Sequence, residues 1–429
     1  MKAVSVEQQQ KHYSNPSVID RWAKRLVLRW LEKITVGHLR LNEAGKYYEF
    51  GETASVATLN AHIVIHNPMV YRDILLNGTV GAGEAYMRGA WSSPDIVQTI
   101  RVMCANMPML NSINEGWSSL NKLLGSIAHR LKANNKSNAR LNIAAHYDLG
   151  NDFFKLFLDK TMMYSSAIFP TDDATLYDAS VYKLAHICER LQLSNSDHLL
   201  EIGTGWGGMA IYAARHYGCR VTTTTISNEQ YLYTCEQVKQ AGLDGLVTVL
   251  KKDYRDLLPS SPDSEGLFDK LVSIEMIEAV GHQYYKDYFR TCTQLLKPDG
   301  LMLIQAITVP DQRYELTRNS SDFIQRYIFP GGELPSLTTI TQHVTIHTDM
   351  QVVSVDDITA HYAKTLSLWR DNFFSRLEQV KAQGFNAVFI RMWDFYLSYC
   401  QGGFEERTIS TVQLLMARPK CRALPVVKH

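Results

Sequence analysis

A glycine-rich segment lies between an apolar run and a helical pattern near the middle of this chain. Glu201-Ile-Gly-Thr-Gly-Trp-Gly-Gly208 follows the apolar His198-Leu-Leu and precedes Met209-Ala-Ile-Tyr-Ala-Ala-Arg215. Glycines let the backbone turn sharply off a strand and approach a ligand closely, while the helix start offers free N–H groups. This order of strand, turn and helix predicts a site for a nucleotide-like cofactor.

The polar residues around this turn favour S-adenosylmethionine over a dinucleotide. Glu201 at the strand end can pair with a cationic amino group, which a dinucleotide lacks at this point. The next strand, Cys219 to Ser227, ends in threonines, where a nicotinamide-binding fold usually carries an acid for the ribose hydroxyls. An adenosylmethionine fold is therefore the favoured interpretation, and other uses of a doubly wound sheet stay open.

Length and charge set the frame around this site. A chain of 429 residues exceeds one typical core, so two domains are expected. Lysine and arginine number 44 against 43 acids, which leaves no global basic field that would indicate a nucleic-acid partner. The sequence has no apolar run of bilayer length and no signal-peptide core at Met1–Glu7. We therefore expect a cytoplasmic protein.

The seven cysteines are scattered along the chain without a C-x-x-C pair. Neither a metal site nor a disulfide framework is expected from such spacing.

A polar segment divides the chain into two expected domains. Residues 1–118 mix short alternating segments with a glycine-rich stretch, Gly78 to Gly89, and predict a small mixed α/β domain. Residues 119–140 predict a connecting helix and a polar linker. In residues 141–429 apolar runs alternate with helical patterns, as in a parallel sheet. Strands are predicted at 197–203, 219–226, 247–252, 269–275, 300–307, 351–357 and 410–418.

The predicted strands place a set of polar residues at one crevice, because ligands of such sheets bind at the carboxyl ends of the strands. The residues at these ends are Glu201, Gly203, Thr225, Asp253, Glu278 and Gln305. At the end of the third strand, the carboxylate of Asp253 can accept from an adenine amino group, and Tyr254 can stack on the ring.

Five motifs then occur in the order seen in cyclopropane fatty acid synthases. They are His146-Tyr-Asp-Leu-Gly-Asn-Asp-Phe-Phe154, Met163-Tyr-Ser-Ser-Ala167, Glu201-Ile-Gly-Thr-Gly-Trp-Gly-Gly208, Thr225-Ile-Ser-Asn-Glu-Gln230 and Tyr327-Ile-Phe-Pro-Gly-Gly-Glu-Leu-Pro-Ser336. The larger domain resembles this family throughout, and Gly83 to Trp91 is similar to the amino-terminal domain of its bacterial phospholipid-modifying members. The resemblance implies a class I S-adenosylmethionine methyltransferase fold: a seven-stranded doubly wound sheet with a lipid-binding cap insertion, and a smaller mixed α/β domain before it.

The family transfers the methyl group of S-adenosylmethionine to a double bond in a phospholipid acyl chain and then closes a ring. The resemblance implies peripheral association with the inner face of the membrane and a homodimer through the first domain. The cofactor contacts that it implies are Tyr147, Tyr164, Ser165, Gly203, Gly205, Thr225, Gln230, Asp253 and Tyr254. Taken alone, Tyr147 and Tyr164 are equally consistent with half-buried aromatics, and Thr225 with a strand residue.

In the family a bicarbonate ion is taken to be the base, held by a cysteine, a glutamate, a histidine, an isoleucine backbone and a tyrosine. Glu278, Ile307 and Tyr362 match three of these positions. Ser166 stands at the cysteine position and Gln305 at the histidine position. Both can hydrogen-bond, but the loss of an imidazolium weakens the hold on an anion. A bicarbonate site of altered strength or a vacant one is expected, with a cyclopropane as product or, alternatively, a methylated chain without ring closure.

Other interpretations stay open at this point. Glu278 can be a helix-capping acid and Ser166 a turn residue. Residues 309–346, with Arg313, Arg318 and Arg326, predict a cap over the crevice, or a solvated face. Residues 20–33 resemble a helix lying in a membrane interface, or one packed on the first domain. A lipid-binding protein without activity and a small-molecule methyltransferase are the two other function classes.

Overall fold

The computed structural model describes residues 17–53, 59–108, 110, 149–257, 268–318, 320, 322–422 and 424. They fall into two compact units, one of Met1–Lys122 with Asn386–Phe395 and one of Leu123–Phe385 with Tyr396–His429. Each unit has its own sheet. The predicted linker, residues 119–140, and the predicted cofactor contact Tyr147 lie outside the described residues.

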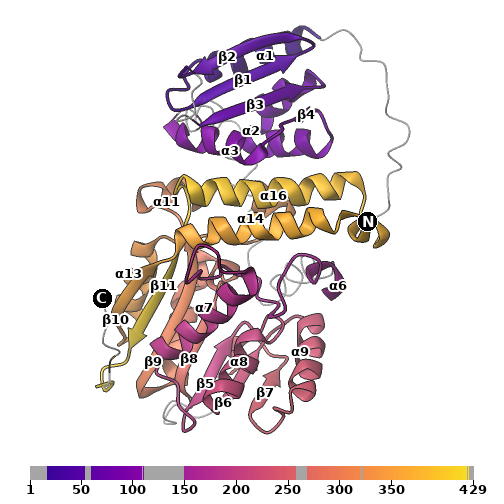
Figure 1. The fold of residues 1–429 in the computed structure, drawn as a ribbon. Helices are drawn as coiled ribbons and strands as arrows, with labels where there is room; N and C mark the ends of the chain where they lie inside the picture. The colour runs from indigo at the N-terminus through magenta and orange to yellow at the C-terminus, as the bar shows by residue number, and fades with distance from the viewer. Residues whose placement is uncertain are drawn as a thin grey trace. The chain divides into compact units, whose positions relative to one another are not determined.

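The first unit is a small mixed α/β fold, as predicted (Figure 1). Its sheet has the order β2-β1-β3-β4, formed by β1 (His38–Glu43), β2 (Lys46–Gly51), β3 (Asn60–Ile65) and β4 (Trp91–Ser92). Its helices are α1 (Val18–Leu31), α2 (Met69–Met87) and α3 (Ile96–Ala105). In β1 the side chains of Leu39 and Leu41 are buried and that of Arg40 is exposed, so one face of the sheet forms the core.

Most of the glycine-rich stretch of the first domain lies in α2. Gly78 has φ 55° and ψ −133°, which kinks the helix. A Cβ atom on Gly81 would lie 2.0 Å from the carbonyl oxygen of Asp73. These glycines therefore allow a bend and a close backbone approach inside the first unit.

The second unit contains the predicted seven-stranded sheet, in the order β10-β11-β9-β8-β5-β6-β7. Its strands are β5 (His198–Ile202), β6 (Arg220–Thr224), β7 (Val247–Leu250), β8 (Phe268–Ile274), β9 (Leu296–Thr308), β10 (Gln351–Asp357) and β11 (Ser410–Ala417). Neighbours among β5 to β9 pair in parallel, and β11 runs antiparallel to both β9 and β10. Every predicted strand of the larger domain is confirmed.

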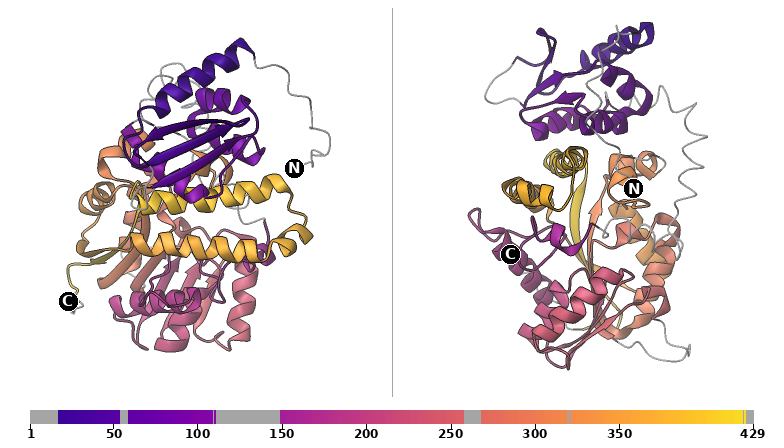
Figure 2. Two further views of the ribbon diagram at one scale, coloured as in Figure 1. Left: turned by 45° about the horizontal axis from the view of Figure 1, so that its top comes forward. Right: turned by 90° about the vertical axis from the view of Figure 1, so that its right-hand side faces the viewer.

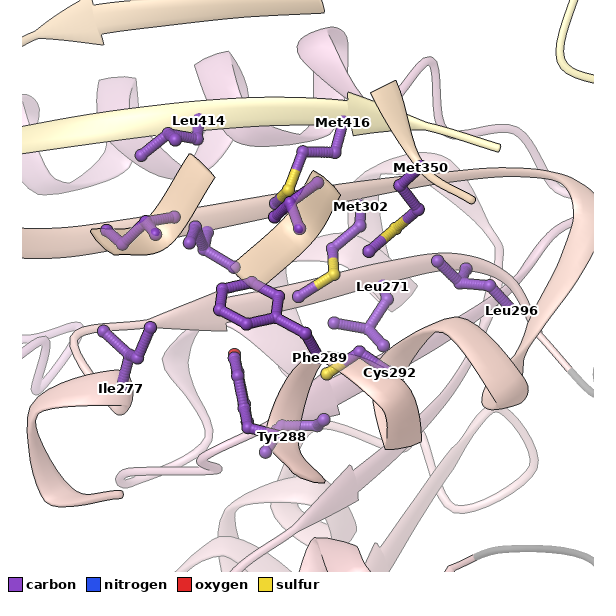
Figure 3. Close-up of a cluster of buried hydrophobic side chains, with 14 of the residues drawn as sticks. Leu271, Ile277, Tyr288, Phe289, Cys292, Leu296, Met302, Met350, Leu414 and Met416 are labelled. Atoms are coloured by element: carbon purple, nitrogen blue, oxygen red, sulfur yellow. The ribbon is translucent and has the colours of Figure 1, made fainter. Parts of the chain in front are cut away.

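Helices cover both faces of this sheet (Figures 1 and 2), because successive side chains of its inner strands point to opposite sides. In β9, Met302 and Ile304 enter one core, while Leu301 and Leu303 enter the other. The first core includes residues of α10 (Tyr285–Leu295) and α13 (Leu337–His347), and Figure 3 shows Phe289 and Cys292 of α10 near Met302, with Tyr288 below Phe289 in this view. The second core includes residues of α7 (Leu176–Arg190) and α8 (Gly208–Tyr217).

The path of the chain through the sheet reverses between β5 and β8. From β5 the chain moves outward to β6 and β7, and it then returns to β8 and β9 on the other side of β5. Ligands of open α/β sheets bind beyond the carboxyl ends of the strands at such a reversal. The segments that follow β5 and β8 are therefore the first place to look for a site.

The other described elements connect and flank these strands. They are α6 (Asn151–Phe154), α9 (Asn228–Gln240), η2 (Tyr254–Asp256), η3 (Ile277–Ala279), η4 (His282–Tyr284), η5 (Asp311–Arg313), α11 (Tyr314–Arg318), α12 (Phe323–Tyr327), α14 (Thr359–Ser375), α15 (Leu377–Ala382) and α16 (Ala387–Glu405). Among the residues described, none of the helices has the length and apolar character needed to cross a membrane.

Candidate active site

The glycine turn, residues 203–208 after β5, has a backbone that glycine adopts most readily. Gly203, Gly205 and Gly207 have φ of 100°, 53° and 88°. A Cβ atom on Gly208 would lie 2.6 Å from the carbonyl oxygen of Thr161, whereas one on Gly205 would meet no atom within 4 Å. Packing therefore requires Gly208, while Gly205 leaves open space beside the turn, as a cofactor that approaches the backbone needs.

Glu201 lies at the end of β5 with its side chain buried. Its Oε2 accepts a hydrogen bond from the Thr223 hydroxyl at 2.6 Å, and that hydroxyl also lies 2.6 Å from the hydroxyl of Thr204. Burial raises the pKa of Glu201 to about 8. A carboxyl in such surroundings gains from a cationic ligand, because a nearby positive charge favours its ionised form.

The structure brings together two of the residues predicted to bind cofactor after β6. The Thr225 hydroxyl donates to Gln230 Oε1 at 2.9 Å and accepts from the backbone N–H of Ser227 at 3.1 Å. The hydroxyl of Ser227 in turn caps α9 by accepting from the backbone N–H of Gln230. This loop is thus tied together by its own side chains.

The other predicted pair, after β7, has partners within the protein. The carboxylate of Asp253 accepts from Arg255 Nε at 2.8 Å and Nη2 at 2.6 Å, and from the Arg255 backbone N–H at 3.0 Å. Tyr254 is buried and packs edge-on against Tyr288, with ring centroids 5.5 Å apart. Both carboxylate oxygens of Asp253 already accept hydrogen bonds from Arg255, so either oxygen would have to share its hydrogen bonding with a ligand.

Tyr164 and Ser165 precede the position predicted for a family cysteine. The Tyr164 hydroxyl lies 2.9 Å from the hydroxyl of Tyr396, and Ser165 Oγ accepts from Lys183 Nζ at 2.6 Å. Lys183 on α7 is completely buried, and this burial lowers its pKa to about 8. The negative charges of Glu275 and Asp159 act in the opposite direction and raise the pKa.

Glu275, at the end of β8, lies at the centre of the predicted anion site. Its Oε1 accepts from the Ser166 backbone N–H at 2.9 Å and from Gln305 Nε2 at 2.7 Å. Its Oε2 accepts from the Tyr362 hydroxyl at 2.7 Å. Burial raises the pKa of Glu275, and hydrogen bonds from Tyr362, Ser166 and Gln305, together with the charge of Lys183, oppose that shift. Sequence reasoning missed this residue.

The orientation of Gln305 follows from a second glutamine. Gln413 Nε2 donates to Gln305 Oε1 at 2.9 Å, so Gln305 Nε2 points to Glu275 and to the carbonyl oxygen of Ser166, at 3.3 Å. Both glutamines are fully buried. The hydroxyl of Ser166 donates to the Ala167 carbonyl at 3.0 Å, so Ser166 serves Glu275 through its backbone.

The predicted residues Glu278 and Ile307 also meet. Glu278 Oε1 accepts from the Ile307 backbone N–H at 2.6 Å, and Glu278 Oε2 is buried and has no hydrogen-bond partner among the described residues. Burial and, next, the charge of Glu275 raise the pKa of Glu278 to about 8. Glu278 lies in η3 and its carboxyl reaches β9, so capping a helix is not its role here. We call Glu275, Glu278 and the groups that donate to them the carboxylate cluster.

Aromatic rings lie next to this cluster. Tyr362 stacks on Phe404 at 4.4 Å and meets Trp369 edge-on at 6.2 Å between ring centroids. Tyr164 lies 5.2 Å from Trp369 and 6.2 Å from Phe329, again between centroids. We call these five rings the aromatic wall. Ring faces can stabilise a positive charge without reacting with it.

Phe329 belongs to the segment 309–346, which was predicted as a cap. Arg318 pairs with Glu315 at 3.3 Å, Arg313 donates to the Thr408 carbonyl, and the Arg326 guanidinium lies over Tyr327 at 5.7 Å. The backbone N–H of Glu333 donates to the Glu278 carbonyl at 2.8 Å. This segment therefore supports η3 and supplies one ring of the aromatic wall.

The family model and similar proteins found by comparison with known proteins point to the same family. Residues 134–414 match the sequence family described as mycolic acid cyclopropane synthetase. The chain is 36% identical over 405 residues to the tuberculostearic acid methyltransferase UfaA1 of Mycobacterium tuberculosis, covering 92% of this chain and 91% of that protein. It is 35% identical over 359 residues to the cyclopropane-fatty-acyl-phospholipid synthase of Escherichia coli, covering 83% and 88%.

Solved structures agree. The mycolic acid cyclopropane synthase CmaA1, complexed with SAH and CTAB, superposes with a TM-score of 0.58 and 30% identity, and the match covers 65% of this chain and 98% of that one. The cyclopropane synthase MmaA2 from Mycobacterium tuberculosis gives a TM-score of 0.59 and 28% identity with the same coverage.

Proposed function

Because the chain belongs to the mycolic acid cyclopropane synthetase family of S-adenosylmethionine-dependent methyltransferases, we propose that it methylates the double bond of unsaturated acyl chains in membrane phospholipids and closes a cyclopropane ring. The observation that carries the proposal is the carboxylate cluster beside the aromatic wall, at the carboxyl ends of β8 and β9. A base next to aromatic rings suits a reaction through a carbocation, because ring faces stabilise positive charge and help to exclude water.

The residues after β5 and β6 fit the cofactor. The open space at Gly205 admits a ligand to the backbone, and the buried Glu201 suits the ammonium group of the methionine part. When bound, S-adenosylmethionine supplies an electrophilic methyl group. We assign the holding of the cofactor to the glycine turn, Glu201, Tyr164, Ser165 and the Thr225–Gln230 pair, with Asp253 and Tyr254 at its adenine end.

The rest of the site would orient the alkene and handle charge. An alkene is a weak nucleophile, so its fixed position against the methyl group supplies much of the acceleration, about 7–11 kcal/mol in favourable cases. Methyl transfer leaves a carbocation on the chain, and Tyr164, Trp369 and Phe329 present ring faces to it while they exclude water. A base must then remove a proton.

The choice of proton decides the product, and one alternative has specific support. The relative that matches 92% of this chain is a tuberculostearic acid methyltransferase. In addition, Ser166 and Gln305 stand where the family resemblance implies a cysteine and a histidine. Loss of a chain proton instead of a methyl proton would give a methylated olefinic chain, and a methyl-branched saturated chain would form only if a separate reductant then supplied a hydride and a proton. Ser166→Cys combined with Gln305→His is expected to raise the cyclopropane fraction if these two residues cause the difference.

The proposal includes peripheral binding to the cytoplasmic face of the membrane. On α1, Val18, Ile19 and Trp22 are 73%, 62% and 52% exposed, and Arg21 and Arg25 are exposed beside them. This mixture suits the interface of an anionic bilayer. Trp22→Ala should reduce sedimentation with anionic vesicles, whereas Leu232→Ala, an equally exposed apolar residue of α9, should not. Dimerisation through the first unit remains a prediction.

Labelling tests the reaction. The protein is expressed in a host without its own synthase and fed methionine with a deuterated methyl group, and phospholipid acyl chains are analysed by mass spectrometry. A chain that carries the label less one deuterium and resists hydrogenation as an alkene supports the cyclopropane. A chain that keeps the whole methyl group supports the alternative. Unlabelled acyl chains would contradict both, and would favour a lipid-binding protein or a methyltransferase of small molecules.

A further inference from the structure

We propose that Glu275 is a built-in replacement for the bicarbonate ion expected at this site, and that its carboxylate is the base of the reaction. The inference rests on the proposed function. It differs from what the family resemblance implies, namely that a bound bicarbonate ion is the base. The residues present in this chain do not fit a free bicarbonate ion.

Whether a bicarbonate ion can bind here depends on the hydrogen-bond donors at this site. Three positions expected to hold bicarbonate are Ser166, Gln305 and Tyr362, and each donates to the Glu275 carboxylate, at 2.9, 2.7 and 2.7 Å. A carboxylate and a bicarbonate present the same planar pair of oxygens, so donors arranged for one suit the other. The ion could bind these donors only after the side chain of Glu275 had left them.

The backbone supports a special role for this side chain. Glu275 has φ 48°, in the left-handed region that favours glycine. Its backbone N–H donates to the Gln305 carbonyl at 2.8 Å, which fixes the end of β8 against β9. Such strain at a non-glycine residue is kept where the surrounding structure holds it, and functional sites are common places for it.

The distribution of partners assigns the negative charge within the pair of acids. Glu275 has three donors and feels the charge of Lys183, whereas Glu278 has one donor and a buried oxygen without a partner among the described residues. The neutral acid is therefore Glu278 and the carboxylate is Glu275. Glu275 is only half-buried, so part of its surface remains open to a bound molecule.

The proton transfer balances without any further reactant. In ring closure, a Glu275 oxygen takes a proton from the transferred methyl group, and the electron pair of that C–H bond forms the last bond of the ring. Glu275 becomes a neutral acid and afterwards releases its proton to solvent. In the olefin-forming alternative the same oxygen takes a proton from the acyl chain, and the electron pair forms the new double bond.

The test compares Glu275→Gly and Glu275→Gln with the wild-type protein in carbon-dioxide-free buffer, with and without added bicarbonate. Methyl transfer by the wild type should be the same in both buffers. Glu275→Gly should lose on the order of 100-fold without bicarbonate and regain much of this when the ion is added, because glycine relieves the backbone strain and vacates the donors. Glu275→Gln should stay inactive in both, since its amide fills the space without a charge.

A second readout does not depend on activity. Binding of ¹³C-labelled bicarbonate, followed by NMR, should be seen with Glu275→Gly and not with the wild type. Bicarbonate binding to the wild type, loss of its activity on removal of carbon dioxide, or full activity of Glu275→Gly without bicarbonate would each overturn the proposal. A wild type that methylates no lipid would instead refute the proposed function, while the NMR comparison would still decide whether Glu275 occupies the ion's place.

Discussion

The glycine turn and the carboxylate cluster, which we propose as the cofactor side and the catalytic side of one site, depend on different parts of the chain. Around the cofactor, Thr225 bonds Gln230 five residues away and Asp253 bonds Arg255 two residues away. The three groups that hold Glu275 come from 30, 87 and 109 residues away. A local motif can therefore keep the cofactor side, whereas the catalytic side exists only when several distant segments meet.

This difference has a chemical meaning. The family is S-adenosylmethionine-dependent, and short motifs are sufficient to hold a cofactor of this kind. In the reaction that we propose, the product depends on which proton leaves the cation, and the groups around the base would decide this. Substitutions at the carboxylate cluster should therefore change the chemistry, while those at the glycine turn should change cofactor affinity.

The largest effect is expected inside the carboxylate cluster. At pH 7, Glu275→Gln should lower methyl transfer by about 100-fold or more, because it removes the base. Glu278→Gln should cost no more than about tenfold, since burial and the charge of Glu275 raise the pKa of Glu278 to about 8 and the amide imitates its neutral form. Initial rates with labelled S-adenosylmethionine measure both. Equal losses would contradict this division of roles.

The glycine turn is tested by a matched pair. Gly205→Ala and Gly242→Ala both place a side chain at a left-handed residue, φ 53° and 66°, with no atom within 4 Å of the new Cβ atom. Each should cost roughly 1–2 kcal/mol of stability through strain. Only Gly205→Ala should also weaken S-adenosylmethionine binding, by about tenfold or more, because its new methyl group occupies space that the cofactor needs. A loss of about 1.4 kcal/mol in binding free energy lowers the affinity tenfold. Calorimetric titration separates the two, and equal affinities would exclude Gly205 from the cofactor site.

The buried acid of the cofactor side should make stability depend on pH. Burial raises the pKa of Glu201 to about 8, so the folded state binds more protons than the unfolded state between pH 4.5 and pH 8. This contribution is complete below the unfolded pKa and is lost as the pH rises through the folded one. In the wild type, the unfolding free energy should therefore fall as the pH rises over this range. In Glu201→Gln the slope of this fall should be smaller by on the order of 1 kcal/mol per pH unit. Urea titrations without cofactor measure it, and an unchanged slope would argue against the raised pKa.

A smaller effect is expected at Gln413, which acts on Glu275 only through Gln305. Gln413→Ala frees the amide of Gln305, which then loses its fixed orientation toward Glu275. The expected result is a several-fold lower kcat with an unchanged KM for S-adenosylmethionine, because one hydrogen bond contributes about 0.5–1.5 kcal/mol. Ser398→Ala, another fully buried polar residue of the second unit, serves as the control for general destabilisation. A raised KM with normal kcat would place the role of Gln413 elsewhere.

Much of the fold was within reach of sequence reasoning for a physical reason. Inner strands such as β5 are short runs of mostly apolar residues, and the helices between them show their own period, so the positions of the strands in the larger sheet could be predicted. The glycine turn was also predictable, because its conformations demand glycine locally.

The carboxylate cluster was only partly predictable. The resemblance identified Glu278, Ile307 and Tyr362, and the structure brings all three to the ends of β8 and β9 or to α14 beside them. Glu275 gave no signal of its own, since an acid three residues before another reads as an ordinary polar position. Its left-handed backbone and its three donors appear only in three dimensions.

The sheet, the cofactor motif and the family could all be predicted from the amino-acid sequence, because each depends on residues close together in the chain or on a periodic pattern. Which of the two acids carries the negative charge follows only from the three-dimensional arrangement of their partners. That choice depends on the number of hydrogen bonds that each carboxyl receives and on its distance from Lys183 and from the other acid, and these follow from the packing of β8, β9, α7 and α14.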